Sequence, residues 1–377
     1  MNILTKPLKT IFPLVCCAAL ALSCNTAIPA EKNEPEAWDQ AQPLYPIYSS
    51  SFLLGNIVSP SDVGGPRFNL LKRHFNTATA ENHMKPDALA PLSAGGSYRF
   101  SAADTMVQAV LDAGLKMHGH TLVWHQQTPS WMNSGSGMTR EQALSNLRTH
   151  VTTVVTHYKD KLISWDVVNE AMRDGLSVAE SSGDWKNCLR KDSPWYTAIG
   201  PDYIQEAFKA ARAADPQVKL YYNDYSLNNA AKAQAVYNMV CDINTRYSNV
   251  EGRPLIDGIG MQSHHHLGTS PNTVDDSINL FSTAGVEIAI SELDIQAFDA
   301  RGGNTSLVWN EDTAQHQARQ YAAMFNIFLQ RQAVISRVTF WGLDDRTSWR
   351  SSSHPVLFDK DYKTKPAFYA VANPSQY

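Results

Sequence analysis

Short apolar runs alternate with amphipathic stretches along most of the chain. Between the runs, apolar residues recur at three- and four-residue steps, as they do on one face of a helix. Thr139 is a predicted helix N-cap with Gln142 at the capping-box position, and Ser101 and Gly114 are predicted to cap and end an earlier helix. Further helices are predicted at 201–214, 230–247, 272–284 and 311–331. Buried strands are predicted at 52–57, 75–80, 116–124, 161–168, 218–223, 256–261, 286–290 and 335–340.

Eight such alternations predict an α/β fold, a (β/α)8 TIM barrel that forms a single catalytic domain over residues 46–377. Parallel strands need crossover helices, and closure into a barrel removes exposed sheet edges. A doubly wound open sheet is the alternative. It is disfavoured because no phosphate-binding glycine loop follows the first strand.

The amino terminus predicts export from the cytoplasm. Lys6 and Lys9 precede an apolar stretch at 11–22, which is the pattern of a signal peptide over residues 1–23, and residues 24–45 are predicted to be a flexible tether. Cys24 ends a sequence that resembles a bacterial lipoprotein cleavage box, so one interpretation is lipidation of Cys24 and membrane attachment. The other is cleavage near Ala27 or Ala30. The predicted location is therefore outside the bacterial cell or on its outer membrane.

The net charge and the cysteine content limit which binding partners and cofactors can be expected. The formal charge of -4 provides no basic field for nucleic acid. Cys188 and Cys241 remain after the leader, either as a disulfide or as two free thiols, and their spacing does not resemble a metal site. We predict a monomer without a cofactor, a metal or a protein partner.

Polar side chains follow nearly every predicted strand. The carboxyl ends of barrel strands converge on one mouth, so these residues should face one another. Two carboxylates among them, Glu170 and Glu292, come from strands across that mouth. The other strand-end residues are Glu81, Asn82, Lys85, His120, Trp124, His125, Gln127, Asn169, Asn223, Asp224, Tyr225, Gln262, His264, Asp294, Trp341, Asp345 and Trp349.

Two carboxyl groups in one cleft suit the hydrolysis of a glycosidic bond. One acid protonates the leaving oxygen, and one carboxylate meets the positive charge that develops at the anomeric carbon. A separation of roughly 5 to 5.5 Å leads to retention of configuration, and about 6.5 to 9.5 Å to inversion. The sequence does not measure that separation.

The motifs around these residues resemble those of glycoside hydrolase family 10 endo-β-1,4-xylanases. The acid/base motif matches residues 165–170 (WDVVNE), and the nucleophile motif matches residues 290–295 (ISELDI). Further matches extend the resemblance over residues 50 to 370, at 79–85 (TAENHMK), 119–125 (GHTLVWH), 257–264 (DGIGMQSH) and 340–342 (FWG).

The resemblance implies a retaining double displacement on xylan and xylo-oligosaccharides, with Glu170 as acid/base and Glu292 as nucleophile. It further implies that Asn169 binds the 2-hydroxyl of the scissile sugar and that His264, supported by Asp294, orients Glu292. The same resemblance implies substrate contacts from His120, Gln262, Trp124, Trp341 and Trp349 at the scissile sugar, from Glu81, Asn82 and Lys85 at the next sugar toward the non-reducing end, and from Gln127 and Tyr225 in the cleft.

The chain departs from the family pattern at Asp344, where a small hydroxyl residue is expected, and in two extended loops at 173–194 and 299–310. Neither departure touches a carried-over catalytic position. The loops are expected to influence which xylan decorations enter the cleft.

Three functions compete: a retaining xylanase, a metal-dependent barrel hydrolase, and a barrel that binds glycans without cleaving them. The presence of both glutamates favours catalysis over binding alone. A cellulase is the near rival, because cellulose carries one extra hydroxymethyl group per sugar. Crowding by Trp349 and Lys85 is expected to exclude that group.

Overall fold

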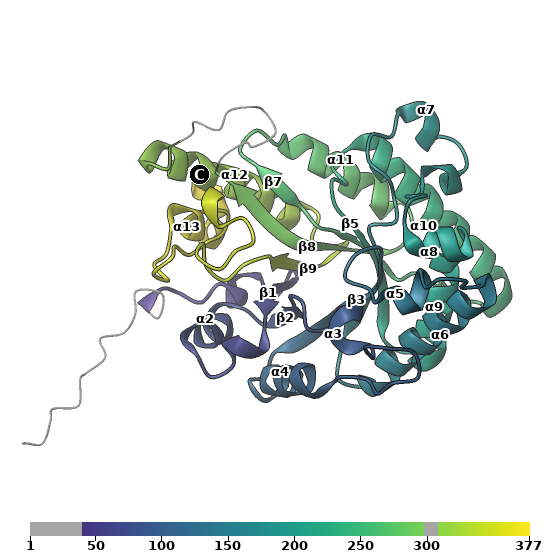
Figure 1. Cartoon of the computed structure of the whole chain (residues 1–377). Coiled ribbons are helices and arrows are strands. Elements are labelled where there is room, and N and C mark those ends of the chain that lie inside the picture. The colour runs from purple at the N-terminus through teal and green to yellow at the C-terminus, as the bar shows by residue number, and fades with distance from the viewer. Residues whose placement is uncertain (1–39, 298–307) are drawn as a thin grey trace, which may run out of the picture. The chain divides into compact units, whose positions relative to one another are not determined.

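The strands form one closed parallel barrel in the computed structural model, which describes residues 40–297 and 308–377 (Figure 1). The order around the sheet is β6-β5-β4-β3-β2-β1-β9-β8-β7, and β6 also pairs with β8, which closes the ring. This confirms the predicted (β/α)8 fold. The strands are β1 (Leu53–Val58), β2 (Thr77–Ala80), β3 (Lys116–Trp124), β4 (Ser164–Asn169), β5 (Lys219–Asp224), β6 (Gly258–Met261), β7 (His264–His266), β8 (Glu287–Gln296) and β9 (Ile335–Phe340).

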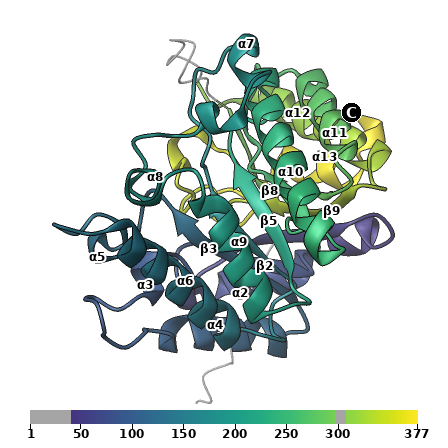
Figure 2. The same ribbon diagram turned by 90° about the vertical axis from the view of Figure 1, so that its right-hand side faces the viewer.

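Helices surround the strands, as Figures 1 and 2 show from two directions. Each main strand is followed by one or more helices that return the chain to the amino-terminal end of the barrel, which is the crossover that parallel pairing requires. The helices are α2 (Pro66–His74), α3 (Pro86–Leu89), α4 (Ser101–Asp112), α5 (Ser130–Asn133), α6 (Arg140–His157), α7 (Val178–Ser181), α8 (Pro194–Ile199), α9 (Tyr203–Ala214), α10 (Ala230–Glu251), α11 (Pro271–Ser282), α12 (Glu311–Gln330) and α13 (Pro366–Ala372).

Helix caps were predicted with mixed success. The box at the start of α6 is confirmed, because the Thr139 hydroxyl accepts from the Gln142 backbone N–H and the Gln142 side chain accepts from the Thr139 backbone N–H. The prediction that Ser101 caps α4 was wrong. The N-cap is Phe100, and Ser101 is the first helical residue, with no side-chain cap bond at that end.

A close contact with an indole ring explains a glycine in the barrel wall. Gly119 on β3 pairs with Trp165 on β4, and a Cβ at Gly119 would lie 2.2 Å from the Trp165 ring. The Trp165 side chain is only 1% exposed, so it has little room to move away. Glycine at this position makes room for the Trp165 indole on β4, the strand that leads to Glu170.

The folded barrel begins before residue 46. Leu44 is fully buried in the core, and a 3-10 helix starts at Tyr45, so the carboxyl end of the predicted tether belongs to the folded domain. The predicted signal peptide, Cys24 and most of the 299–310 loop lie outside the described residues. Within the described part, no helix combines the length and apolar character needed to cross a membrane. Cys188 and Cys241 are both free thiols.

Candidate active site

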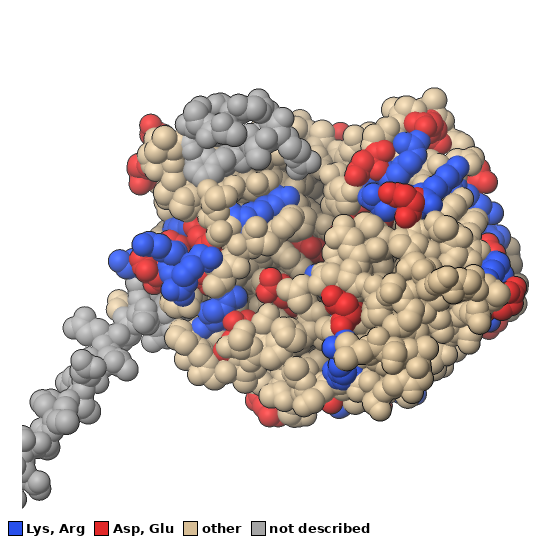
Figure 3. All heavy atoms as spheres, viewed as in Figure 1, with Lys and Arg blue, Asp and Glu red and all other residues tan. Residues whose placement is uncertain are grey.

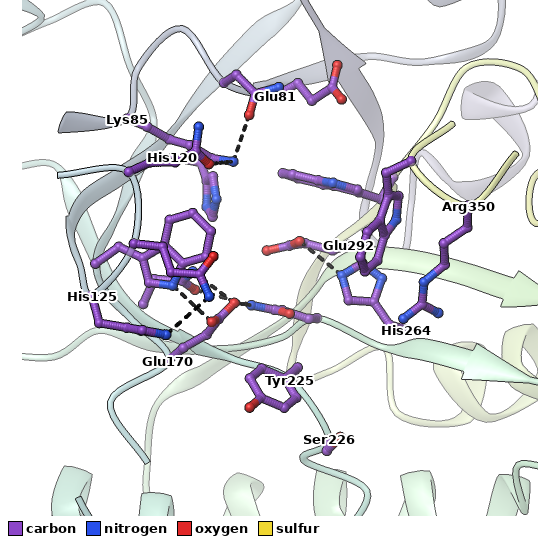
Figure 4. Close-up of a pocket in the computed structure, with 18 of the residues that line it drawn as sticks. Glu81, Lys85, His120, His125, Glu170, Tyr225, Ser226, His264, Glu292 and Arg350 are labelled. Carbon is purple, nitrogen blue, oxygen red and sulfur yellow. Dashed lines mark hydrogen bonds and ion pairs between the residues drawn. The ribbon is translucent and has the colours of Figure 1, made fainter. Parts of the chain in front are cut away.

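A cleft of about 590 Å³ lies at the carboxyl ends of the barrel strands. Figure 3 shows acidic side chains around a hollow in this face, and Figure 4 shows Glu170 and Glu292 extending into it from β4 and β8. Every site residue predicted within the barrel lines the cleft except Asp294, which lies behind His264. The lining residues are Glu81, Asn82, Lys85, His120, Trp124, His125, Gln126, Gln127, Asn169, Glu170, Arg190, Tyr225, Ser226, Gln262, His264, Glu292, Trp341, Trp349 and Arg350.

Glu170 leaves the end of β4 in a left-handed conformation with a φ of 59°. That turn directs its carboxylate into the cleft, where neutral groups donate to it. The Trp124 indole N–H lies 2.9 Å from Oε2, and the amides of Gln262 and Asn169 lie 2.9 and 3.2 Å from Oε1. The carboxyl group is therefore held in place without a formal positive charge among these three donors.

Glu292, on β8, is only 5% exposed and, unlike Glu170, lies beside a histidine. The Asn223 amide donates to its Oε1 at 2.8 Å, and His264 Nε2 lies 3.2 Å from its Oε2. Burial raises the pKa of Glu292, but the His264 hydrogen bond, the nearby charge of His120 and the Asn223 bond outweigh burial and lower that pKa below its ordinary value. Glu292 is thus kept ionised.

His264 connects Glu292 to a second buried carboxylate. Its Nδ1 lies 2.8 Å from Asp294 Oδ2, and Asp294 also accepts from the Trp349 indole at 2.9 Å and from Arg350 at 3.1 Å. Burial lowers the pKa of His264, but Asp294 and Glu292 overcome that effect and raise the pKa to about 9. A protonated imidazole donates from both ring nitrogens, which fixes its orientation between the two carboxylates.

An amide network joins the two glutamates. The Asn169 side-chain oxygen accepts from Asn223 at 3.0 Å and from Gln262 at 3.2 Å, which leaves the Asn169 N–H₂ group directed at Glu170. The Ser291 hydroxyl donates to the Asn223 oxygen at 2.6 Å and fixes that amide as well. Asn223 therefore contacts both Glu292 and the group beside Glu170.

A second set of polar groups lies on the β2 side of the cleft. Lys85 Nζ donates to Asn82 at 2.8 Å and to Gln127 at 3.0 Å, and it lies 5.0 Å from the centre of the Trp124 ring. Burial lowers the pKa of Lys85, and Glu292 and Glu81 oppose this only in part. Burial likewise raises the pKa of Glu81. These groups present donors and acceptors close together, which suits sugar hydroxyls.

His120 and Trp341 form part of the cleft floor. Their rings meet edge to face at 5.3 Å, and His120 Nδ1 lies 2.9 Å from the buried carboxylate of Asp166. His118 also contacts Asp166, at 3.0 Å. Burial raises the pKa of Asp166, but the two histidines hold it well below its usual range. Asp166 is thus a structural group beneath the cleft.

The sequence assigned no role to several residues that the structure places in or beside the site: His125, Gln126, Arg190, Asn223, Ser226 and Arg350. Asn223 was recognised only as a strand-end residue, and its position at the carboxyl end of β5 is the signal that could have identified it. Arg350 follows Trp349 and donates to Asp294. Arg190 comes from the extended β4 loop and donates to the Tyr225 hydroxyl at 2.9 Å. No sequence pattern pointed to Arg190, because it lies within a long loop and not at the end of a predicted strand.

The arrangement provides one ionised carboxylate and one carboxyl group held by neutral donors, across a cleft lined by indoles and amides. This is the pairing that acid-assisted displacement at an anomeric carbon requires. In residues 40–297 and 308–377, no group of three or more His, Cys, Asp or Glu side chains is arranged to hold a metal ion.

Comparison with known proteins gives a consistent picture. The sequence model of glycosyl hydrolase family 10 matches residues 44–374. Endo-1,4-beta-xylanase A of Thermoanaerobacterium saccharolyticum is 38% identical over 88% of the chain, and Exoglucanase XynX of Acetivibrio thermocellus is 37% identical over 88%. The chain spans only 28% and 29% of the length of these two relatives.

A solved structure covers the same region. An intracellular xylanase from Thermoanaerobacterium saccharolyticum, in complex with xylotriose, is 36% identical with a TM-score of 0.77. The match covers 88% of this chain and 99% of that chain. The likeness therefore includes nearly the whole of a barrel that was crystallised with a xylo-oligosaccharide.

Proposed function

The chain belongs to glycosyl hydrolase family 10, and on this premise we propose that it is an endo-acting β-1,4-xylanase that cleaves xylan with retention of configuration. The observation that carries the proposal is the unequal environment of Glu170 and Glu292 within one cleft. The charged His264 lowers the pKa of Glu292, whereas neutral groups hold Glu170. The xylanase relative and the xylotriose complex support xylan as the substrate.

The proposed reaction has two displacements. Glu292 attacks the anomeric carbon as the glycosidic bond breaks, and Glu170 gives its proton to the leaving oxygen. This step forms a covalent glycosyl-enzyme and releases the sugar chain on the other side of the cleaved bond. Glu170, now ionised, takes a proton from water, whose oxygen attacks the same carbon and releases Glu292. Both glutamates return to their starting states.

The remaining cleft residues are proposed to bind and orient the sugar chain. Asn169 holds the 2-hydroxyl of the scissile sugar, because its N–H₂ group lies beside Glu170 at the cleft and uses only one hydrogen in its bond to Glu170. His264, backed by Asp294, orients Glu292. His120, Gln262, Trp124, Trp341 and Trp349 contact the scissile sugar, Glu81, Asn82 and Lys85 bind the next sugar toward the non-reducing end, and Gln127 and Tyr225 complete the cleft.

A cellulase is the second candidate, because the Acetivibrio thermocellus relative is named an exoglucanase. We favour xylan because Trp349 and Lys85 line the cleft and are expected to crowd the additional hydroxymethyl group of a glucose unit. Similar turnover on xylan and on cellulose would refute this preference. Inactivation by a chelator would support the metal-dependent hydrolase, and binding of xylan without release of reducing ends would support the glycan-binding barrel.

The stereochemistry of the product tests the proposal. Time-resolved proton NMR of xylohexaose hydrolysis should show the β-anomer of the new reducing end first, followed by slow mutarotation to the α-anomer. The Glu292→Ala variant serves as the control and should release no reducing ends. Initial appearance of the α-anomer would contradict the double displacement.

Export, lipidation of Cys24 and a monomeric state complete the proposal. Export and lipidation rest on Lys6, Lys9, the apolar stretch at 11–22 and Cys24, all outside the described residues, and cleavage near Ala27 or Ala30 is the alternative to lipidation. The relative solved with xylotriose is intracellular, so similarity of the barrel alone does not indicate where the chain is located. Fractionation of cells that express the full chain and its Cys24→Ala variant tests the anchor. The variant should move from the membrane to the soluble exported fraction.

A further inference from the structure

One arginine outside the cleft connects two of the loops that form its wall. Arg67, near the start of α2, donates from Nε to Asp62 Oδ1 at 2.6 Å, and its Nη1 contacts Asp344 in the loop after β9. The side chains are 14%, 6% and 0% exposed for Arg67, Asp62 and Asp344. We call these three residues the Arg67 clasp.

The Asp344 side of the clasp fixes the turn that precedes Trp349. The Thr347 backbone N–H donates to Asp344 Oδ1 at 3.1 Å, and the Thr347 hydroxyl donates to Oδ2 at 2.9 Å. Arg67 contacts Thr347 as well. Trp349 follows two residues later and donates its indole N–H to Asp294. The clasp therefore acts on the segment that carries an indole into the cleft.

Asp62 is connected to the cleft through Ser59 and Glu81. Asp62 Oδ2 accepts from the Ser59 backbone N–H at 2.8 Å, and the Ser59 hydroxyl donates to Glu81 Oε2 at 3.2 Å. Glu81 lines the cleft beside Lys85. One guanidinium thus joins the loop that supports Glu81 to the loop that carries Trp349.

Trp349 is poorly buried, and its contacts include the Asp294 hydrogen bond, the Arg350 guanidinium 4.2 Å from the centre of its ring, and the His264 ring. It is 57% exposed, although it lines the cleft and meets the His264 ring at 4.9 Å. The position of an exposed side chain follows the backbone that carries it. Asp344 also stands at the position where the resemblance to the family leads us to expect a small hydroxyl residue.

We propose that Arg67 and Asp344 are positioning residues that hold Trp349 over the cleft and so set the preference for xylose over a sugar that carries a hydroxymethyl group. The proposal rests on the proposed xylanase function and names residues outside its catalytic set. Loss of the clasp lets the loop move outward, which makes room for the hydroxymethyl group and weakens contact with the smaller sugar.

The test compares Asp344→Ser with a matched break of a buried ion pair elsewhere. Asp257 pairs with Arg212 at the amino-terminal end of β6, with side chains 16% and 6% exposed, and lies at the end of the barrel away from the cleft. Asp257→Ser therefore imposes a similar loss of stability without touching either loop. For both variants, kcat/KM is measured on p-nitrophenyl β-xylobioside and p-nitrophenyl β-cellobioside, well below the melting temperature.

Asp344→Ser should raise the cellobioside-to-xylobioside ratio of kcat/KM about fivefold, through a higher KM for the xylobioside, while Asp257→Ser leaves the ratio unchanged. Arg67→Gln should give a similar rise, and the double variant no further rise, because both residues act through one contact. An unchanged ratio in Asp344→Ser, or an equal change in Asp257→Ser, overturns the proposal. A parent enzyme that cleaves neither glycoside overturns the proposed function itself, and the clasp with it.

Discussion

His264 lies between the buried carboxylates of Asp294 and Glu292. Its positive charge acts on Glu292, whereas the side chains that donate to Glu170 are neutral. His264 contacts Asp294 through Nδ1 and Glu292 through Nε2, and both carboxylates raise its pKa to about 9. The imidazolium in turn lowers the pKa of Glu292. Burial alone would have the opposite effect on each group, so the charge pairing decides the protonation states.

Replacement of His264 by Asn should move the acidic limb of the kcat/KM profile to higher pH. Glu292 must be ionised to attack, and loss of the imidazolium raises its pKa, so activity begins to rise only at a higher pH. We expect kcat/KM to fall roughly 100-fold at the parent's optimum, the scale of losing one preorganised donor. The measurement is a pH–rate series on an aryl xylobioside. An acidic limb at the parent's position would contradict this role for His264.

Replacement of Glu170 by Gln should affect substrates unequally. Xylan has a poor leaving group that needs a proton, so activity on xylan should fall by about 1,000-fold or more. The phenolate of an aryl xylobioside can leave without protonation, so formation of the glycosyl-enzyme should be much less impaired. This first step should be visible as a burst of released phenol. Equal losses on both substrates would remove Glu170 from the role of acid.

The sequence was sufficient to place the residues whose chemistry is visible in a motif. Glu170 and Glu292 stand at predicted strand ends, and the structure brings both to one cleft. Asn223 also stands at a strand end, but its role depends on which way its amide turns across the mouth. That direction is set by Ser291 and Asn169, which are distant in sequence, so no local pattern reveals it.

At the scale of elements, β3 and β4 pack together through a glycine and an indole. Gly119→Ala places a Cβ against the buried Trp165 ring, and overpacking of this kind costs about 1 to 3 kcal/mol. We expect a lower urea midpoint and reduced activity, because Trp165 supports the strand that ends at Glu170. Gly183→Ala is the control, since its Cβ would meet only the Glu180 carbonyl at 3.5 Å. Equal midpoints for the two variants would show that the ring can move aside.

Long periodic elements were predictable, and short ones were not. β3 and β9 begin and end at the predicted residues, although both include polar residues such as His118 and Arg337. α2 was not predicted, and its polar composition, with Arg67, Lys72 and Arg73, explains why a hydrophobic period is hard to see. β7 has three residues and exists through its pairing with β8, so only the tertiary structure defines it.

At the scale of the whole molecule, buried histidines should make stability depend on pH in both directions. Burial lowers the pKa of His118 and His150 to about 4, from an ordinary value of 6.5. The unfolded chain binds protons at these positions between pH 4 and 6.5 that the folded chain does not, so stability falls as the pH drops through that window.

His264 has the opposite sign, because its pKa in the folded protein is about 9. The stability it contributes is fully present below pH 6.5 and is lost as the pH rises toward 9. Urea midpoints measured from pH 4 to 9 should therefore peak near pH 6.5, and the His264→Asn variant should lose the decline on the alkaline side. An unchanged alkaline decline in that variant would contradict this assignment.

Barrel closure itself could be predicted, because eight alternations without a break in composition leave few other arrangements. The contacts between loops could not. The Arg67 clasp joins residues that are 277 positions apart, and Asp344 appeared in the sequence only as an unexplained departure from a family pattern. Its partner becomes visible when β1 and β9 pair and bring their loops together.

The central claim is that Glu292 forms a covalent bond to the sugar while Glu170 moves the proton. Incubation with a 2-deoxy-2-fluoro-xylobioside that carries a good leaving group should trap the intermediate, and peptide mass spectrometry should locate the adduct on Glu292. Labelling of any other residue, or no labelling of an enzyme that is active on xylan, would contradict the account.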